Sequence, residues 1–289
     1  CEAAKDHGRD RIEIYDESDQ SIIRRYDDMQ MVAEIQQALD SDQFGLLLQP
    51  ILSLKDEDAM PCYEVLLRMQ DSEGARVPSD ALFSAAERYR LMPQIDRWVV
   101  SKTIARLGEA ADQVDFDSAS FAVNLSGQSL GDDEILEFIE DEIRESNLPA
   151  SCLAFEITES AAVSNLEKAQ NFIERLHGLG CSISLDDFGA GLSSFAYLKN
   201  FKVDTLKIDG GFIRDITDNR ISESMVAAIT QVAKVMELQT VAEYVECDDT
   251  RDLVLSIGVD FAQGHAIGKP RPIDDVLDEL IDSAASSTA

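Results

Sequence analysis

Residues 182–191 read Ser-Ile-Ser-Leu-Asp-Asp-Phe-Gly-Ala-Gly and place two adjacent carboxylates at the end of a short apolar run. The alternating isoleucine and leucine predict a buried strand. Because consecutive strand residues point to opposite faces, Asp186 and Asp187 can face one site only if the strand stops at about Asp186 and the backbone turns. The two glycines that follow supply the freedom for that turn.

Two carboxylates held together repel each other unless a cation lies between them. This stretch alone is compatible with a metal site and equally with the solvated start of a loop, where Asp and Gly are common. The metal site becomes the better interpretation because seven other strand-like runs also carry polar residues near their ends.

The composition limits the class of protein and its partners. A chain of 289 residues with 45% apolar residues can form one large α/β domain or two ordinary ones. Lys and Arg number 25 and Asp and Glu 56, which gives a net charge of −31. This charge argues against sustained contact with DNA or with an anionic membrane. An anionic small substrate would need metal cations to reverse the local sign.

The cysteine and histidine patterns indicate a cytoplasmic protein without a zinc site. Five cysteines are scattered without C-x-x-C spacing, which is typical of a reducing cytosol, and the three histidines form no cluster. No apolar run reaches 18 residues and no signal peptide is visible. Because the chain starts at Cys1 rather than Met, we expect a fragment of a longer protein, and that parent could be membrane-anchored.

Strand-like and helix-like segments alternate along the chain. The strand-like runs are 44–54, 61–69, 120–126, 153–159, 182–187, 205–209, 239–246 and 260–267. The helix-like segments are 29–41, 79–107, 132–146, 162–179, 220–237 and 248–257. Eight strands that alternate mostly with helices over about 250 residues predict an α/β fold, a closed (β/α)8 barrel of the TIM type.

The first connection departs from this alternation. Only residues 55–60 separate the first two strands, and a helical crossover between parallel strands needs about a dozen residues or more. We therefore expect a barrel whose first strand is antiparallel to its neighbours. The alternative is an open, doubly wound sheet.

Each strand-like run carries a polar residue near its end, where an apolar one is expected. These residues are Gln49, Glu64, Asn124, Glu156, Asp186 with Asp187, Lys207 with Asp209, Glu243 and Gln263. In a barrel, the carboxyl ends of the strands converge on the face that carries the chemistry. A lone Glu in a strand is more often a rim residue, but matched positions in every run are hard to explain in that way. Carboxylates with an Asn and without His or Cys suit Mg²⁺ or Mn²⁺.

The two-residue period of strands sorts the neighbours of these residues. Glu64, Leu66 and Arg68 share one face, so the Arg68 guanidinium could grip a phosphate beside a metal ligand or form a salt bridge at the rim. Lys207 and Asp209 also share a face. Lys207 is therefore either a structural counter-charge or a group that holds a water or a phosphate oxygen.

The fourth run ends with a second glutamate. Glu156 shares its face with Thr158, which leaves Glu159 at the junction between strand and loop. There Glu159 could accept hydrogen bonds from backbone N–H groups of residues 186–195.

Together these motifs resemble the EAL domain, the family of cyclic di-GMP phosphodiesterases, over residues 30–285. The matching segments are Q-P-I at 49–51, E-V-L-L-R at 64–68, N-L-S at 124–126, E-I-T-E at 156–159, D-D-F-G-A-G at 186–191, K-I-D at 207–209, A-E-Y-V-E at 242–246 and Q-G at 263–264. The resemblance is specific, because several separate motifs occur in the family's order. The departures are Val65, Ala190, Leu192 and Tyr244, where the family commonly has Ala, Thr, an aromatic residue and Gly. None of them removes a metal ligand.

The resemblance implies a role for each residue at the strand ends. The ligands of one metal would be Glu64, Asn124, Glu156 and Asp186. The ligands of a second metal would be Asp186, Asp187 and Glu243. Lys207 would position the attacking water and, with Glu64 and Glu243, form the catalytic set. The residues implied for substrate binding are Gln49, Leu66, Arg68, Asp209 and Gln263. Glu159 would brace the loop on the metal side.

Residues 1–25 carry a second, weaker resemblance to the closing stretch of a GGDEF diguanylate cyclase domain, without that domain's catalytic residues. It implies a GGDEF remnant with linker at 1–28 and an EAL phosphodiesterase domain at 29–285. The parent protein would then carry GGDEF and sensory domains upstream.

The resemblance implies hydrolysis of cyclic di-GMP to linear pGpG in bacterial second-messenger signalling, with two Mg²⁺ or Mn²⁺ ions per site. Ca²⁺ should bind but support turnover poorly, and so inhibit, because it is the weaker Lewis acid. Two alternatives remain open. One is a catalytically silent cyclic di-GMP receptor that signals through a protein partner, and the other is a barrel that acts only as a regulatory or dimerising module.

Residues 186–200 carry many apolar side chains for a segment beside a polar site. They are Phe188, Leu192, Phe195, Tyr197 and Leu198. These side chains either pack on the barrel or form a contact between two copies of the chain. The family resemblance favours a homodimer.

Overall fold

The computed structural model describes residues 20–41, 43–56, 59–71, 74–114, 116, 119–191 and 195–287. The chain divides into two compact units, which we call the barrel unit (45–67 and 93–289) and the helical unit (1–44 and 68–92). Most of the stretch 1–25 that resembles a GGDEF tail lies outside the described residues.

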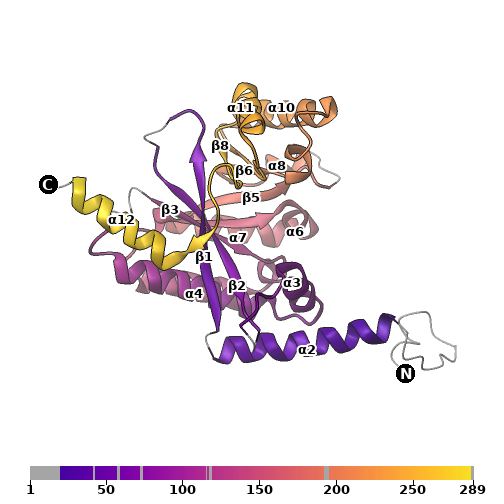
Figure 1. The fold of residues 1–289 in the computed structure, drawn as a ribbon, viewed down its shortest axis with the longest axis vertical. Helices are drawn as coiled ribbons and strands as arrows, with labels where there is room; N and C mark the ends of the chain where they lie inside the picture. The colour runs from indigo at the N-terminus through magenta and orange to yellow at the C-terminus, as the bar shows by residue number, and fades with distance from the viewer. Residues whose placement is uncertain are drawn as a thin grey trace. The chain divides into compact units, whose positions relative to one another are not determined.

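The barrel unit is built on one sheet. Its strands are β1 (Phe44–Ser53), β2 (Cys62–Met69), β3 (Ser120–Leu125), β4 (Leu153–Thr158), β5 (Ser182–Phe188), β6 (Thr205–Ile208), β7 (Gln239–Ala242), β8 (Phe261–Ala262) and β9 (Arg271–Pro272). Their order is β2-β3-β4-β5-β6-β7-β8-β1-β9, and the pairing of β2 with β1 closes the barrel. Strands β2 to β8 pair in parallel, whereas β1 is antiparallel to β8 and β9 (Figure 1). The predicted barrel with a reversed first strand is confirmed, and β9 is an addition to it.

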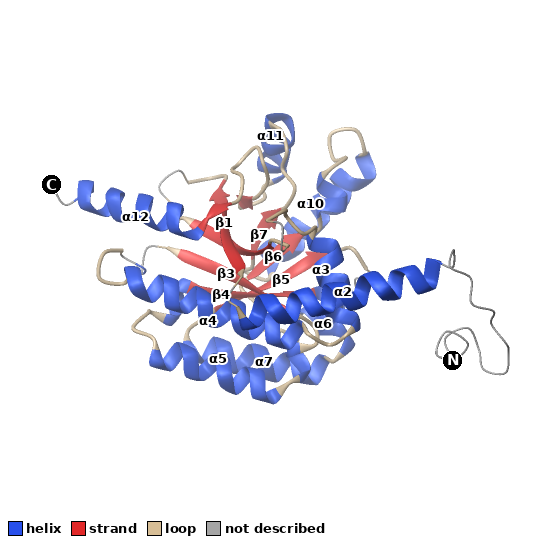
Figure 2. Ribbon diagram, turned by 60° about the horizontal axis from the view of Figure 1, so that its bottom comes forward, coloured by secondary structure: helices blue, strands red, loops and turns tan. Residues whose placement is uncertain are grey.

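Helices connect the strands of the barrel unit. They are α4 (Met92–Ala110), η2 (Ser129–Gly131), α5 (Asp133–Glu145), η3 (Ala150–Cys152), α6 (Glu159–Ser164), α7 (Leu166–Leu179), α8 (Phe195–Leu198), α9 (Gly210–Ile213), α10 (Arg220–Val235), α11 (Asp248–Ile257) and α12 (Ile273–Ser287). In Figure 2, α4, α5 and α7 lie along one side of strands β3 and β4. Helix α5 buries Ile135, Ile139 and Ile143 at helical spacing, which explains why this segment covers the sheet.

The helix expected at 79–107 is wrong in extent, because two helices share that segment. The first is α3 (Ser79–Arg88) in the helical unit, which also contains α2 (Gln20–Asp40) and the ion pair of Arg88 with Asp28. The chain breaks after α3 at Arg90, whose φ of 59° is left-handed and cannot continue a helix. Helix α4 then restarts at Met92 with Pro93 in its first turn, where a missing N–H group costs nothing.

Two further boundaries differ from expectation. The helix expected at 162–179 is divided into α6 and α7 at Asn165, whose side chain accepts a hydrogen bond from Lys168 N and begins the second helix. Strands β7 and β8 end at Ala242 and Ala262, earlier than predicted. The chain leaves the sheet there and presents its next residues to the site.

The two aspartates of β5 lie at an irregularity of the strand. The register of β5 against β6 shifts between Leu185 and Phe188, and Asp187 has a left-handed φ of 51°. The backbone therefore turns at the aspartates, as the sequence required. It then rejoins the sheet at Phe188, one residue beyond the predicted end, because this side chain is fully buried in the core.

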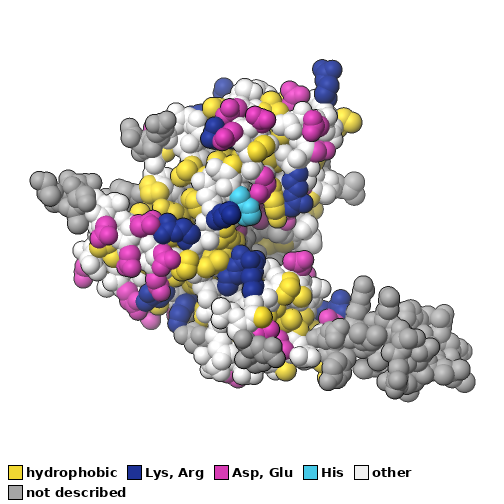
Figure 3. Space-filling view, viewed as in Figure 1, with side chains coloured by type: hydrophobic (Ala, Val, Ile, Leu, Met, Phe, Trp, Pro, Cys, Tyr) yellow, Lys and Arg dark blue, Asp and Glu magenta, His cyan; other side chains and the backbone are white. Residues whose placement is uncertain are grey.

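The surface carries the acidic charge in a dispersed form. On the face shown in Figure 3, Asp and Glu side chains are scattered among basic and hydrophobic ones. Exposed acidic helix positions such as Asp133, Glu134 and Glu137 contribute to the net charge of −31. No helix in the described part of the chain combines the length and apolar character needed to cross a bilayer.

Candidate functional site

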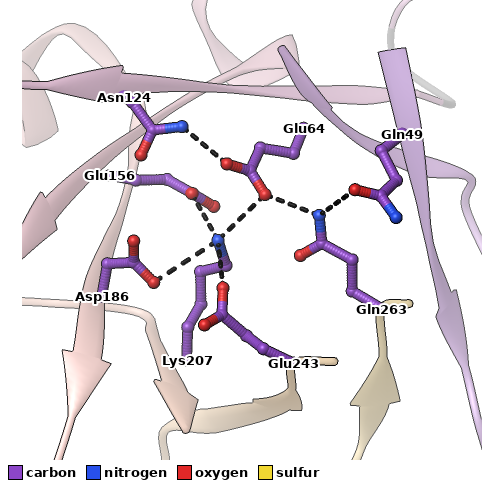
Figure 4. Close-up of polar contacts among 8 residues, drawn as sticks. All are labelled: Gln49, Glu64, Asn124, Glu156, Asp186, Lys207, Glu243 and Gln263. Atoms are coloured by element: carbon purple, nitrogen blue, oxygen red, sulfur yellow. Dashed lines mark hydrogen bonds and ion pairs between the residues drawn. The ribbon is translucent and has the colours of Figure 1, made fainter. Parts of the chain in front are cut away.

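Lys207 lies at the centre of a ring of carboxylates at the carboxyl ends of the barrel strands (Figure 4). The distances from its Nζ atom are 2.6 Å to Glu156 Oε2, 2.9 Å to Glu243 Oε1, 3.1 Å to Glu64 Oε2 and 3.4 Å to Asp186 Oδ1. Only 1% of Lys207 is exposed. A buried ammonium must be paired with opposite charge, and residues from β2, β4, β5 and the end of β7 supply that charge. The strand ends thus converge as the sequence indicated.

Three of these residues, together with Gln263, are buried and form what we call the buried cluster: Glu64, Glu156, Lys207 and Gln263. Asn124 Nδ2 and Gln263 Nε2 each donate a hydrogen bond of 2.6 Å to Glu64, and Lys207 adds a third of 3.1 Å. Burial raises the pKa of Glu64, but Lys207 and these donors outweigh it and hold that pKa below its usual value. Glu64 is therefore a fully engaged carboxylate.

The other two ionisable groups of the buried cluster have strongly shifted pKa values. Burial raises the pKa of Glu156 well above its usual value, and the charges of Glu64 and Asp186 add to that effect while Lys207 opposes it. Burial also disfavours the charge of Lys207, but the surrounding carboxylates outweigh it and raise the lysine pKa. One ammonium cannot neutralise four carboxylates, so the site attracts further cations.

A second group, which we call the open cluster, consists of Asp186, Asp187 and Glu243. One carboxylate oxygen of each lies within 4.8 Å of one from each of the others. Asp187 is exposed and the other two are half-buried. Burial raises the pKa of Asp187, and the charges of Asp186 and Asp209 add to it. Burial, opposed by Lys207, raises the pKa of Glu243 to about 8.

The open cluster fits a divalent cation. Asp186 Oδ1 is buried and makes no hydrogen bond, although it lies 3.4 Å from Lys207 Nζ. A buried carboxylate oxygen without a hydrogen bond is costly unless another partner is supplied. All the donors here are oxygen atoms, which suits hard cations such as Mg²⁺ and Mn²⁺.

Two groups of residues support the site. Glu159, 5% exposed, accepts a hydrogen bond of 2.9 Å from Gly189 N, in the loop that follows the aspartates. Gln49 accepts a hydrogen bond of 3.3 Å from Gln263 Nε2 and donates one of 3.1 Å to Gly268 O. Gln49 is thereby connected to Glu64 through Gln263.

Three further residues assigned to substrate binding have the following surroundings. Asp209 is the N-cap of α9 and accepts a hydrogen bond of 2.9 Å from Gly211 N. Leu66 is half-buried in β2. Arg68, later in β2, falls in the helical unit, and burial followed by the charge of Arg76 lowers its pKa.

Sequence reasoning missed a buried acid that holds the loop after Asn124. Asp96 Oδ2, on α4, accepts hydrogen bonds from Ser126 N at 2.9 Å and Ser129 Oγ at 2.6 Å. Only 4% of Asp96 is exposed, and burial raises its pKa against the effect of these donors. In the sequence Asp96 stands between Ile95 and Arg97 and looks like an ordinary surface acid, so no local signal marked it.

The segment 186–200 is less apolar on its surface than its composition suggests. Phe188 and Leu198 are fully buried, and Tyr197 is half-buried. Leu192 lies outside the described residues. Two of the five apolar residues therefore pack in the core and are not available to a second copy of the chain.

The fold and the site define a TIM-like barrel with a carboxylate cluster around a buried lysine at its strand ends. The EAL domain family matches residues 32–270, and the chain therefore belongs to the EAL domain family.

Similar proteins include two curated relatives. The chain is 36% identical over 280 residues to cyclic di-GMP phosphodiesterase PdeB of Shewanella oneidensis, which covers 97% of this chain and 32% of PdeB. It is 37% identical over 254 residues to cyclic di-GMP phosphodiesterase PdeF of Escherichia coli K12, which covers 88% of this chain and 33% of PdeF. The chain thus spans about a third of the length of these relatives.

Two solved structures with bound c-di-GMP are also similar to this chain. The PaMucR phosphodiesterase in complex with c-di-GMP superposes with a TM-score of 0.79 and 28% identity, covering 86% of this chain and 99% of that one. The FimX EAL domain from Pseudomonas aeruginosa bound to c-di-GMP gives a TM-score of 0.76 and 30% identity, covering 83% of this chain and 96% of that one.

Proposed function

We propose that this chain is a phosphodiesterase that hydrolyses cyclic di-GMP to linear pGpG with two divalent cations, Mg²⁺ or Mn²⁺. The observation that carries the proposal is the open cluster, three carboxylates within 4.8 Å of one another beside a buried ammonium, one of them with an unbonded oxygen. The names of PdeB and PdeF support the substrate.

The cations would be held by the two clusters together. The ligands of one would be Glu64, Asn124, Glu156 and Asp186, and those of the other Asp186, Asp187 and Glu243. When bound, the cations would lower the pKa of a water molecule and offset the phosphate charge. They would also solve the problem of bringing a dianion to a protein with a net charge of −31.

The catalytic residues of the chain would be Lys207, Glu64 and Glu243. Glu64 and Glu243 hold the Lys207 ammonium at 3.1 and 2.9 Å, so it can donate from a fixed position to the attacking water. The water oxygen forms a new bond to phosphorus, the bond to one ribose 3′ oxygen breaks, and that oxygen takes up a proton. The product is a linear dinucleotide with a 5′ phosphate.

Substrate binding would involve a second set of side chains. This set is Gln49, Leu66, Arg68, Asp209 and Gln263. The Arg68 guanidinium matches the fork of a phosphate, and the amides of Gln49 and Gln263 are already ordered by hydrogen bonds. Glu159 would keep the loop after Asp187 in place.

The assay is incubation of the protein with cyclic di-GMP and Mg²⁺ or Mn²⁺, followed by chromatography for pGpG. We expect product with either metal, none with excess EDTA, and little with Ca²⁺, because Ca²⁺ is the weaker Lewis acid. Asp252→Asn, on an exposed part of α11, is the control and should leave product formation unchanged. Full turnover in EDTA would refute the two-metal mechanism.

A second candidate is a catalytically silent receptor for cyclic di-GMP. It is favoured by the similarity to an EAL domain whose solved structure holds c-di-GMP. Calorimetric binding of cyclic di-GMP without pGpG formation in either metal would support it. The complete set of carboxylates favours the enzyme.

The organisation of the parent protein remains a proposal as well. We assign 1–28 to a GGDEF remnant with linker and 29–285 to the EAL domain, in a cytoplasmic part of a longer signalling protein. The described cysteines are all free, which agrees with a reducing compartment. A homodimer is proposed on the family resemblance, and light scattering at micromolar concentration tests it.

A further inference from the structure

Tyr244 follows Glu243 of the open cluster and has an unusual backbone. Its φ is 52°, in the left-handed region that bulky side chains seldom adopt. Glycine would reach that region without strain. A tyrosine needs compensating contacts to be held there.

The strained backbone accommodates an extra residue between two strand ends. Gln263 N donates to Ala242 O at 2.9 Å, and Gln263 O accepts from Val245 N at 2.9 Å. Glu243 and Tyr244 lie between these two bonds, one residue more than a regular parallel ladder contains. This is a β-bulge, and bulges re-aim side chains at functional sites. Val241 pairs with Lys207, so Glu243, two residues further on, faces the same side, and its carboxylate lies 2.9 Å from Lys207 Nζ at the start of the bulge.

The Tyr244 ring packs on α9, the short helix that follows β6. A Cβ atom added to Gly210 would lie 2.1 Å from the ring, so the ring lies directly on the Gly210 backbone. The Arg214 guanidinium lies 3.9 Å from the ring centroid, a cation–π contact. Gly210 and Arg214 are one helical turn apart, joined by a backbone hydrogen bond of 3.0 Å. The ring therefore ties the Glu243 bulge to the turn that directly follows Lys207.

We infer that Tyr244 is a positioning residue whose ring fixes the bulge and thereby holds the Glu243 carboxylate in place in the open cluster. It acts through Glu243. The expected effect on metal affinity rests on the proposed function. The role of the ring in fixing the bulge rests only on the contacts described above. Because the Tyr244 ring contacts Gly210 and Arg214, the position of the neighbouring Glu243 depends on these two residues.

The first experiment measures Mn²⁺ affinity by calorimetry without substrate. Tyr244→Ala keeps the unfavourable φ and removes the ring, so Mn²⁺ affinity should fall about tenfold, the usual effect of losing a residue that orients a ligand. Tyr244→Phe keeps the ring and should bind within about twofold of the wild type. Tyr89→Ala, a half-exposed tyrosine of the helical unit, is the matched control. Wild-type affinity in Tyr244→Ala would overturn the inference.

A double-mutant cycle tests the ring contact itself. The nearest atoms to an added Cβ at Gly210 all belong to the Tyr244 side chain, so Gly210→Ala should disturb only that ring. Gly210→Ala should weaken Mn²⁺ binding in the wild type, and should have no effect when Tyr244→Gly is also present. An equal effect of Gly210→Ala in both backgrounds would contradict the role of the ring.

Amide hydrogen exchange separates this inference from the proposed function, because it needs no metal. The Val245 amide, which closes the bulge on Gln263, should exchange about tenfold faster in Tyr244→Ala than in the wild type or Tyr244→Phe. The amide of Thr240, which lies in β7 and donates to Asp260 Oδ2, should not change. Failure of the wild type to bind Mn²⁺ would refute the proposed function, and unchanged Val245 exchange would refute the positioning role.

Discussion

The buried cluster and the open cluster share one lysine but differ in how their charges are satisfied. In the buried cluster, Glu64 receives donors from Asn124, Lys207 and Gln263, so its carboxylate is saturated by the protein itself. In the open cluster, Asp187 is exposed and Asp186 Oδ1 makes no hydrogen bond. A carboxylate is therefore hydrogen-bonded by the protein itself at one end of the site and is left available to a cation at the other.

This difference teaches how a strongly acidic barrel can stay folded around a charged site. Buried carboxylates are tolerated only when they are paired, and their pairing with Lys207 offsets the cost of removing them from water. Asp187 is exposed, so water can solvate its carboxylate when no cation is bound. Lys207 is the link, because it contacts Glu64 and Glu156 on one side and Asp186 and Glu243 on the other.

The largest effect should come from removing the shared charge. Lys207→Ala leaves buried carboxylates without their partner, so the metal-free protein should lose about 3–5 kcal/mol of unfolding free energy. Turnover should fall by about 10²–10³, the usual cost of one group that stabilises a transition state. Denaturant unfolding and pGpG chromatography measure the two effects. Lys202→Ala, an exposed lysine, is the control, and equal stability of the two variants would contradict the structural role.

The open cluster should respond in the opposite way. Asp186→Asn keeps the shape of the side chain and removes one of the four carboxylates around Lys207, so three remain to pair the ammonium and metal-free stability should fall less than in Lys207→Ala. Mn²⁺ affinity should fall by more than about 100-fold, because a ligand is lost rather than a residue that orients one. Calorimetry measures the affinity, with Asp252→Asn as the exposed control. A stability loss without a change in affinity would mean that Asp186 belongs with the buried cluster.

The loop behind the open cluster offers an intermediate effect. Glu159→Ala leaves the Gly189 N–H group without its 2.9 Å acceptor, and the expected loss of unfolding free energy is about 1–3 kcal/mol. Glu174→Ala removes an exposed ion pair with Lys202 and should cost less than about 1 kcal/mol. Thermal unfolding of the two variants makes the comparison. Equal losses would show that the loop does not depend on Glu159.

The smallest expected effect is a pH dependence of folding stability that comes from Asp96, the residue that holds the loop after Asn124. Burial raises the folded-state pKa of Asp96 above its unfolded value, so its stabilising contribution is fully present below the unfolded pKa and declines as pH rises through the folded pKa. Asp96→Asn removes this titration. Its stability relative to the wild type should therefore increase with pH above about 4, measured by urea unfolding at several pH values. A constant difference would exclude Asp96 as the cause.

The sequence predicted the barrel and the convergence of its polar strand ends because both depend on local periodicity. Alternation in 182–187 and the short connection 55–60 were sufficient for the strand and for the reversal of β1. The break at Arg90 and the division at Asn165 were missed, because a single left-handed residue or a side-chain cap leaves helical periodicity almost intact on both sides.

Contacts between distant segments were beyond the reach of sequence patterns. The hydrogen bond from Gln263 Nε2 to Glu64 joins residues 199 positions apart in the sequence. The hydrogen bond from Ser126 N to Asp96 joins the loop after β3 to helix α4. The bulge at Glu243 and Tyr244 exists only because Gln263 bonds on both sides of it. Such features follow from the closed barrel, so they can be derived only once the fold is known.

The reversed strand β1 also limits how early the barrel can close while the chain is being synthesised. Leu52 pairs with Ala262, 210 residues later (262 − 52), and Leu47 pairs with Pro272. At about 5–20 residues per second, β1 must wait about 10–40 s on the ribosome before its partners exist. Until then, one edge of β1 and the edge of the growing sheet lack their final partners and are open to wrong pairing. Ring closure therefore requires residues 261–262 to have been made, and the ring of carboxylates around Lys207 cannot be complete before Glu243 has been added to the chain.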